Sequence, residues 1–138
     1  MRSIVPAIVI GGFIATTAAS AHHSHPDFPA DQDATVEGTV ERIQFENPHV
    51  LITLRTAEST LYTLEWQSAK WLANQPRVFV TPVPGPITSD MLKVGDRIIV
   101  TGVPPRDPTR HELVNLKAVN RPADNWLWTC RRPPGHSC

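Results

Sequence analysis

Hydrophobic and polar residues alternate in five short stretches of this chain, and a period of two is the pattern of β-strands that bury one face. The stretches cover residues 34–45, 50–54, 62–66, 97–103 and 111–119. In the first stretch the apolar positions shift from Val36 and Val40 to Ile43 and Phe45. Such a change of parity indicates a β-bulge near Arg42.

A short helical segment is predicted between the third and fourth strands. Residues 68–74 suit one or two helical turns, with Ser68 as N-cap and Pro76 just beyond the end. Five strands with such an insert predict an all-β fold, a small five-stranded OB-like Greek-key barrel over residues 34–122. A long first strand that bends near a glycine suits this fold, because barrel strands must coil to close. An open β-sandwich is the alternative.

Residues 1–21 have the pattern of a cleavable signal peptide. Arg2 precedes an apolar run, and the small residues that follow suit cleavage after Ala21. A membrane anchor is the alternative, but two threonines end the apolar run before the ~20 residues that span a bilayer. We therefore expect a periplasmic or secreted protein with no membrane partner after cleavage.

Charge argues against one class of partner. The 138 residues include 13 Lys+Arg and 13 Asp+Glu, so the formal net charge is zero. Removal of residues 1–21 would take one basic residue with it and leave 117 residues with a charge of −1. Nucleic-acid-binding domains normally carry a basic excess, so nucleic acid is not an expected partner.

Residues 123–138 are expected to form a C-terminal tail that carries two tryptophans and both cysteines of the chain. An oxidising compartment favours a disulfide between Cys130 and Cys138, which would close a short loop. A copper site made of the two thiols is the alternative. We expect Trp126 and Trp128 to cover one end of the barrel.

Three of the six histidines, His22, His23 and His25, would lie at the start of the mature chain, in an arm over residues 22–33 that is predicted to be extended. The new α-amine and the imidazole of His22 can chelate one metal ion, and a third histidine nitrogen would complete a copper site. Tetragonal nitrogen ligation suits Cu(II). With cleavage before Ala21 instead, His23 in third position can bind Cu(II) or Ni(II). The alternative is an arm that binds metal only adventitiously, as an affinity tag does.

His49 is the internal histidine with the best position for a ligand. It follows the Asn47-Pro48 turn signal at the mouth of the second strand, where a turn delivers a side chain to the barrel end. It is either the partner that the arm folds back to meet or a histidine satisfied by backbone hydrogen bonds. His111 and His136 are expected to be solvated. The predicted metal ligands, with copper as the favoured ion, are His22, His23, His25 and His49.

Two functions are consistent with these features. The first is a non-enzymatic module that binds a transition metal. The second is an interaction module whose barrel face, with Tyr62, Trp66 and the proline-rich loop, binds a peptide, a glycan or a protein. The sequence shows no Ser/His/Asp or Cys/His constellation and no glycine-rich phosphate loop, so an enzyme is the least favoured class. Oxygen activation by a copper brace is the one enzymatic route that the histidines suggest.

Several short motifs resemble those of a known family. They are Ala21-His22-His23-Ser24, Gly38-Thr39-Val40, the phrase from Phe45 to Val50, Glu65-Trp66 and the turn from Leu92 to Asp96. Over roughly residues 21–119 the chain resembles the small exported bacterial proteins catalogued as domain of unknown function 6152. It departs from them in a longer proline-rich loop at 76–88, in its cysteine-bearing tail and in His25, where the family often has phenylalanine. The resemblance implies a periplasmic OB-like barrel and supplies no established activity.

Overall fold

A computed structural model describes residues 26–74 and 86–130. The expected signal peptide, the histidines at 22, 23 and 25, most of the proline-rich loop and Cys138 lie outside the described residues. The predicted disulfide and the predicted arm ligands therefore stay predictions.

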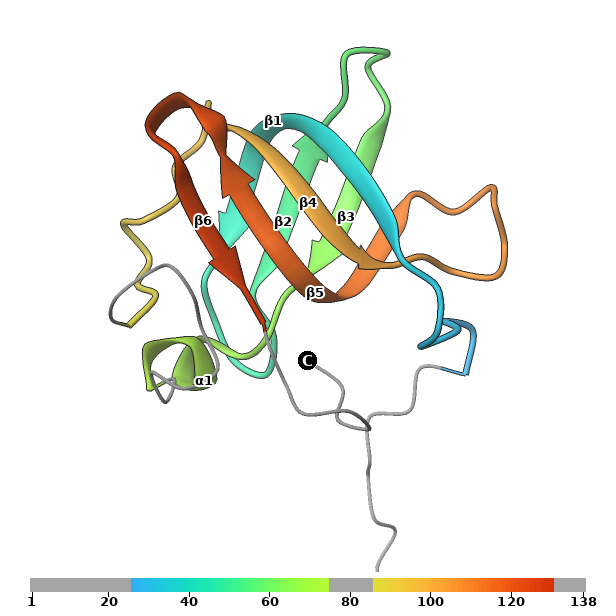
Figure 1. The fold of residues 1–138 in the computed structure, drawn as a ribbon, viewed down its shortest axis with the longest axis horizontal. Helices are drawn as coiled ribbons and strands as arrows, with labels where there is room; N and C mark the ends of the chain where they lie inside the picture. Colours follow the sequence, from blue (N-terminus) through green and yellow to red (C-terminus); the bar gives the residue numbers. More distant parts are fainter. Residues whose placement is uncertain (1–25, 75–85, 131–138) are drawn as a thin grey trace, which may run out of the picture.

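The described chain forms six β-strands and one short α-helix (Figure 1). The strands are β1 (Ala34–Gln44), β2 (Leu51–Arg55), β3 (Leu61–Glu65), β4 (Arg97–Val103), β5 (Glu112–Arg121) and β6 (Trp126–Thr129). The helix is α1 (Ala69–Ala73), and a 3-10 turn, η2 (Pro122–Asp124), joins the last two strands. The ends of the five predicted strands and of the helix agree with these bounds within one or two residues.

The first five strands close into a barrel. The hydrogen-bonded order is β3-β2-β1-β4-β5-β6, and a parallel pairing of β3 with β5 closes the sheet at Thr63↔Glu112 and Leu64↔Leu113. The OB-like barrel is therefore confirmed, and the open sandwich is wrong. Closure depends on β1, which pairs with β4 through its first half and with β2 through its second (Figure 1). The register of β1 shifts between Val40 and Arg42, where the sequence predicts a bulge.

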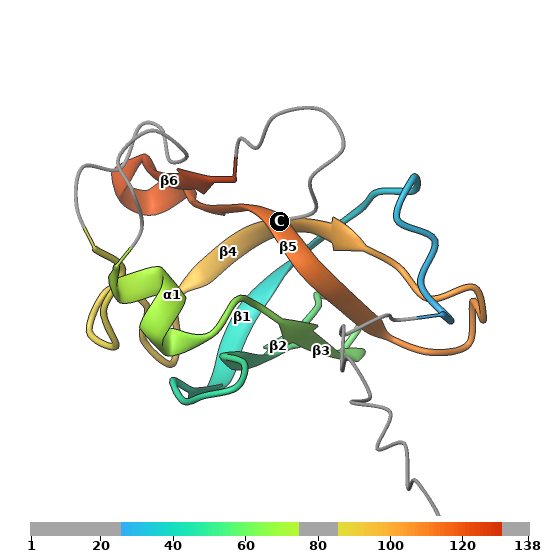
Figure 2. The same cartoon turned by 90° about the horizontal axis from the view of Figure 1, so that it is seen from below.

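The core fills the barrel with alternate side chains of every barrel strand. These include Val40, Ile52, Leu54, Leu64, Ile98, Val100, Leu116 and Val119. At one end of the barrel, α1 covers the core with the buried Leu72 (Figure 2). Its N-terminus is capped as predicted, because the Trp71 amide donates to Ser68 Oγ at 3.1 Å.

The sheet continues beyond the five predicted strands. Residues 126–129, expected in a tail, form β6 and pair antiparallel with β5, with Trp128 opposite Val119. The chain reverses through η2 and Asn125, which adopts a left-handed φ of 57°. Trp128 is completely buried and belongs to the core, whereas Trp126 is half-buried. Trp126 thus lies at the surface of the barrel and Trp128 in its core, and both belong to a strand of the sheet.

The described part of the arm, residues 26–33, is not extended. Its backbone turns, with Gln32 N donating to Pro29 O at 3.1 Å, and it is held against the β4–β5 connection. Arg106 N donates to Asp27 O at 2.7 Å, and the Arg110 guanidinium lies 3.6 Å from the Asp27 carboxylate and 5.2 Å from the centre of the Phe28 ring. The prolines predict irregular backbone correctly, but these long-range contacts, not local sequence, set its path.

Arg121 ties the turn before β4 to the end of β5. Its guanidinium donates to the Met91 carbonyl at 2.6 Å and to the carboxylates of Asp96 and Asp124, both at 2.8 Å. Its side chain is 18% exposed, so these charged hydrogen bonds are only partly screened. We expect Arg121→Ala to lower the free energy of unfolding by about 2 kcal/mol, because each charge-assisted bond contributes more than a neutral one. Urea denaturation of both proteins measures the difference.

The same contact makes part of this stability depend on pH. The hydrogen bond from Arg121 lowers the pKa of Asp124 below its ordinary value. A carboxylate whose pKa is lower in the folded protein than in the unfolded chain stabilises the fold at a pH above its pKa in the unfolded chain. That contribution is lost as the pH falls through its pKa in the folded protein. In Arg121→Ala the acid-side decline in stability should therefore be shallower. An equally steep decline in the variant would contradict this assignment.

Candidate functional site

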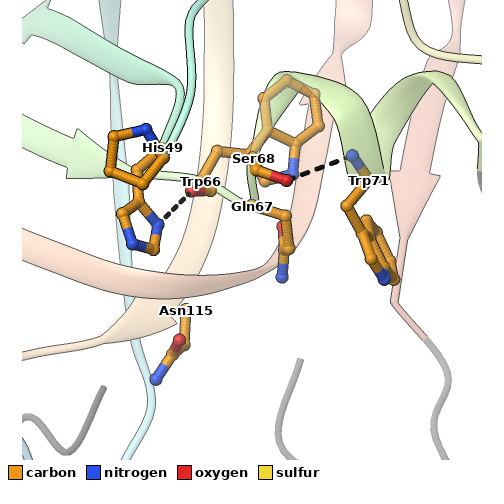
Figure 3. A pocket seen from close by; sticks show the side chains of 7 residues that line it. His49, Trp66, Gln67, Ser68, Trp71 and Asn115 are labelled. Carbon is orange, nitrogen blue, oxygen red and sulfur yellow. Dashed lines mark hydrogen bonds between the residues drawn. The ribbon is translucent and has the colours of Figure 1, made fainter. Parts of the chain in front are cut away.

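A pocket of about 290 Å³ lies beside α1 and includes the one described histidine that the sequence proposes as a ligand (Figure 3). Its lining residues are Pro48, His49, Trp66, Gln67, Ser68, Trp71 and Asn115. A second, more polar groove of about 750 Å³ lies between β1 and the tip of the β2–β3 hairpin. His111 borders that groove, with its ring centre 5.2 Å from the Tyr62 ring.

The backbone around His49 is fixed on both sides. Before it, the cis Asn47–Pro48 bond turns the chain, and Asn47 Oδ1 accepts a hydrogen bond from Lys70 N at 3.1 Å. After it, Val50 N donates to Gln67 O at 3.1 Å and Val50 O accepts from Trp66 N at 2.9 Å. The turn is thus held by the first residues of α1 and by the β2–β3 ladder. These contacts place His49 on a rigid part of the barrel.

The imidazole of His49 has two acceptors at one nitrogen. Its Nδ1 lies 3.4 Å from the carbonyl oxygen of Trp66 (Figure 3). The same nitrogen lies 3.2 Å from Glu65 Oε1. The side chains of His49 and Glu65 are 28% and 23% exposed, so both are partly open to solvent. A carbonyl oxygen only accepts, so the hydrogen bond to Trp66 requires a proton on Nδ1 and leaves the lone pair of the neutral ring at Nε2.

The positions of Trp66 and Tyr62 differ from the expectation that both lie on one interaction face of the barrel. Trp66 is only 2% exposed and packs edge-on against Trp128, with ring centres 5.0 Å apart and planes at 78°. A side chain so deeply buried cannot offer an open face to a peptide or a glycan. Tyr62, the other proposed aromatic, is half-buried in the separate groove. The two aromatics expected on one interaction face therefore lie in different hollows.

Four residues at the site were not identified from the sequence, and one of them is Gln67, which follows Trp66 along the pocket wall. Glu65 and Trp71 reach His49 and the pocket through the register of β3 and through α1, respectively. Asn115 enters from β5, where it has a left-handed φ of 49° inside a register shift against β4 (Figure 3). An asparagine that interrupts an apolar run in a predicted strand is the one signal available for it, since asparagine tolerates this conformation better than most residues.

The structure does not assemble a complete metal site from the residues it describes. Within 26–74 and 86–130, no three His, Cys, Asp or Glu side chains lie close enough together to hold an ion. His49 and His111 line separate hollows. His49 could therefore supply one nitrogen ligand, and any further ligands would have to come from elsewhere in the chain.

The fold and the site define a small all-β barrel with one end covered by a helix and a histidine-bearing pocket beside that helix. A family model described as a family of unknown function, DUF6152, matches residues 12–115. The chain belongs to this family. No match was found among curated proteins or among solved structures. In the part of the chain that the structure describes, no helix has the length and apolar character needed to cross a membrane.

Proposed function

We propose that this protein is an exported, non-enzymatic copper-binding module. His49 would supply a preoriented nitrogen from the barrel, and the processed N-terminus would supply the α-amine and imidazole of His22, with His23 or His25 as a further ligand. The observation that carries the proposal is the setting of His49, whose Nδ1 faces a carboxylate and a carbonyl. Metal-binding histidines commonly have such acceptors at the nitrogen that does not bind the metal.

The segment 27–33, which follows the arm histidines, is anchored to the barrel at the β4–β5 connection. Contacts of Asp27 and Phe28 with Arg110 fix the chain to the barrel only a few residues after the three histidines. His22, His23 and His25 precede this segment in the sequence, and the proposal requires the arm to bring them to His49. In the same proposal, residues 1–21 direct export and Cys130 pairs with Cys138.

A copper titration of the mature chain, beginning at His22, tests the proposal. We expect the parent to bind Cu(II) at 1:1 stoichiometry. His49→Ala should bind Cu(II) at least about tenfold more weakly than the parent, because the variant loses one nitrogen ligand. His111→Ala is the matched control, since it removes a histidine of the other hollow and should leave the affinity unchanged. Competition with a chelator of known affinity measures both. Equal affinity in His49→Ala and the parent would contradict the proposal, because the arm would then bind copper without the barrel, as an affinity tag does.

The interaction module remains the second candidate, and the groove beside Tyr62 and His111 is the observation that favours it. This groove is the larger hollow, and threonine hydroxyls, glutamates and arginines line it. Deletion of residues 22–25 separates the two functions. Copper binding should be lost in that variant, whereas a ligand of the groove should bind as before.

A further inference from the structure

We infer that the groove beside β1 binds an extended peptide, which adds to the sheet as one more strand along a free edge of β1. This inference rests on the interaction module, the second candidate function, and not on copper binding. It gives that module a ligand class and a binding mode. Three features of the described residues support it: a strand edge with no neighbouring strand, a groove along that edge, and a carboxylate on the far side of the groove.

β1 has a free edge over its first half. The strand pairs with β4 from Ala34 to Thr39, and its pairing with β2 begins only at Thr39. Within residues 26–74 and 86–130, no strand other than β2 and β4 pairs with β1. Residues 35–38 therefore have β4 on one side and no strand on the other. An edge of this kind can accept an added strand.

The alternation of backbone groups along β1 identifies those that face this edge. Val40 N donates to Asp96 O and Val40 O accepts from Gly95 N, both at 2.8 Å, so the backbone of Val40 faces the turn into β4. Hydrogen-bonding direction alternates from residue to residue in an antiparallel ladder. The N–H and C=O groups of Thr35 and Glu37 therefore point away from β4. In the part of the chain that the structure describes, no backbone hydrogen bond reaches them from that side.

The groove of about 750 Å³ runs along this edge. Residues 35–39 line one side of it, and residues 56–58 of the β2–β3 turn line the other. At Gly38 the two strands are so close that a Cβ atom would meet the Arg55 carbonyl oxygen, and beyond that point the hairpin leads away from β1 (Figure 1). Residues 35–39 span about 13 Å, which is the length of a short extended peptide. The groove thus lies where an added strand would have to lie.

The lining of the groove indicates which side chains the peptide carries. Val36 and the half-buried Tyr62 pack against the core and offer apolar surface to every second residue of an added strand. Glu37 and Glu41 are paired with arginines, whereas Glu58 lines the groove without an ion pair to a described residue. Carboxylates in the lining outnumber guanidinium groups by three to two. We therefore expect a peptide with alternating apolar residues and a basic residue that faces Glu58.

The experiment uses a variant that blocks only the free edge. Glu37→Pro removes the N–H that faces the groove and should keep the pairing with β4, because proline is tolerated in a strand where its N–H is not part of the ladder. Glu37→Thr is the matched control. It loses the same carboxylate and the same ion pair with Arg97 but keeps the N–H.

The probe is a phage-displayed library of random heptapeptides, selected against the mature chain that begins at His22. Enriched peptides are synthesised and titrated by fluorescence polarisation. We expect them to alternate apolar and polar residues and to bind Glu37→Thr nearly as tightly as the parent. They should bind Glu37→Pro at least about tenfold more weakly, because the proline ring takes the place of a backbone donor.

Amide hydrogen exchange gives a second readout, which needs no variant. In the free protein the amides of Thr35 and Glu37 should exchange fast, and those of Val36 and Gly38, which face β4, should exchange slowly. A saturating peptide should slow exchange at Thr35 and Glu37 and leave the other two amides unchanged. A peptide that contacts side chains alone would not produce this alternation.

The outcomes separate strand addition from the functions proposed above. If peptides bind the groove but neither the proline variant nor the exchange pattern reveals the edge, the interaction module stands and strand addition is overturned. If the library yields no enriched peptide, the inference is overturned, whereas the copper titration still decides the metal-binding function. Slow exchange at Thr35 and Glu37 in concentrated protein without peptide would show that a second copy occupies the edge, and would overturn the peptide assignment.

Discussion

Replacement of Gly38 by alanine is expected to lower the free energy of unfolding by more than about 3 kcal/mol, a loss at the upper end of overpacking effects. A Cβ atom at this position would lie 2.3 Å from the carbonyl oxygen of Arg55 and 2.8 Å from its carbonyl carbon. Both are backbone atoms of β2, so no rotamer change can relieve the contact. Leu54 Cγ, at 3.0 Å, crowds the same space from the core.

The position of Gly38 in the barrel explains this close approach. It lies on β1 next to Thr39, the residue at which pairing with β2 begins while pairing with β4 is still in place. The strand must coil most tightly where it belongs to both pairings, and an absent side chain permits that coiling. The variant would have to separate β1 from β2, which opens the barrel.

Gly95→Ala is the matched control for this prediction. Gly95 has a φ of +95°, but a Cβ there would meet no atom within 4 Å. Its substitution should therefore lower stability only through backbone strain, by about 1 kcal/mol. Urea denaturation of the two variants distinguishes crowding from strain. Equal losses in both would contradict the crowding that we assign to Gly38.

Much of the barrel was predictable because most of its strands bury one face and so keep a period of two. Val36, Gly38 and Val40 show that period, and the change of parity to Ile43 locates the bulge of β1. β6 carries no such signal. It has four residues, and three neighbouring apolar side chains, Trp126 to Trp128, conceal which face is buried. Only its pairing with β5 shows that it is a strand.

The site was predictable in part. His49 follows a turn signal at a strand end, and Glu65, which lies opposite Leu51, could have been found by aligning the β2 and β3 patterns about their hairpin turn. Asn115 and Trp71 could not be found in this way. Asn115 depends on an irregular register between β4 and β5, and Trp71 depends on how α1 packs at the barrel end. Both are consequences of tertiary packing, which local periodicity does not encode.

Trp128→Ala is expected to lower the free energy of unfolding by about 3–5 kcal/mol, the usual range for removal of a buried large aromatic side chain. Trp128 has no exposed surface, and its ring makes a T-shaped contact with Trp66. The truncation would leave a cavity between β6 and the barrel, behind the wall that Trp66 gives to the His49 pocket. The loss measures how fully β6 belongs to the core.

Trp126→Ala is the matched control for Trp128→Ala, because it removes the other tryptophan of β6. Trp126 lies on the same strand but is half-buried, with the Arg121 guanidinium carbon 5.6 Å from its ring centre. Its removal should lower stability by only about 1 kcal/mol, from one partly exposed cation–π contact and some packing. If both variants are equally mild in urea denaturation, β6 is a loosely attached edge. If only Trp128→Ala is severe, β6 is an integral wall of the barrel, and the pocket beside His49 depends on a strand that follows the five-strand barrel in the sequence.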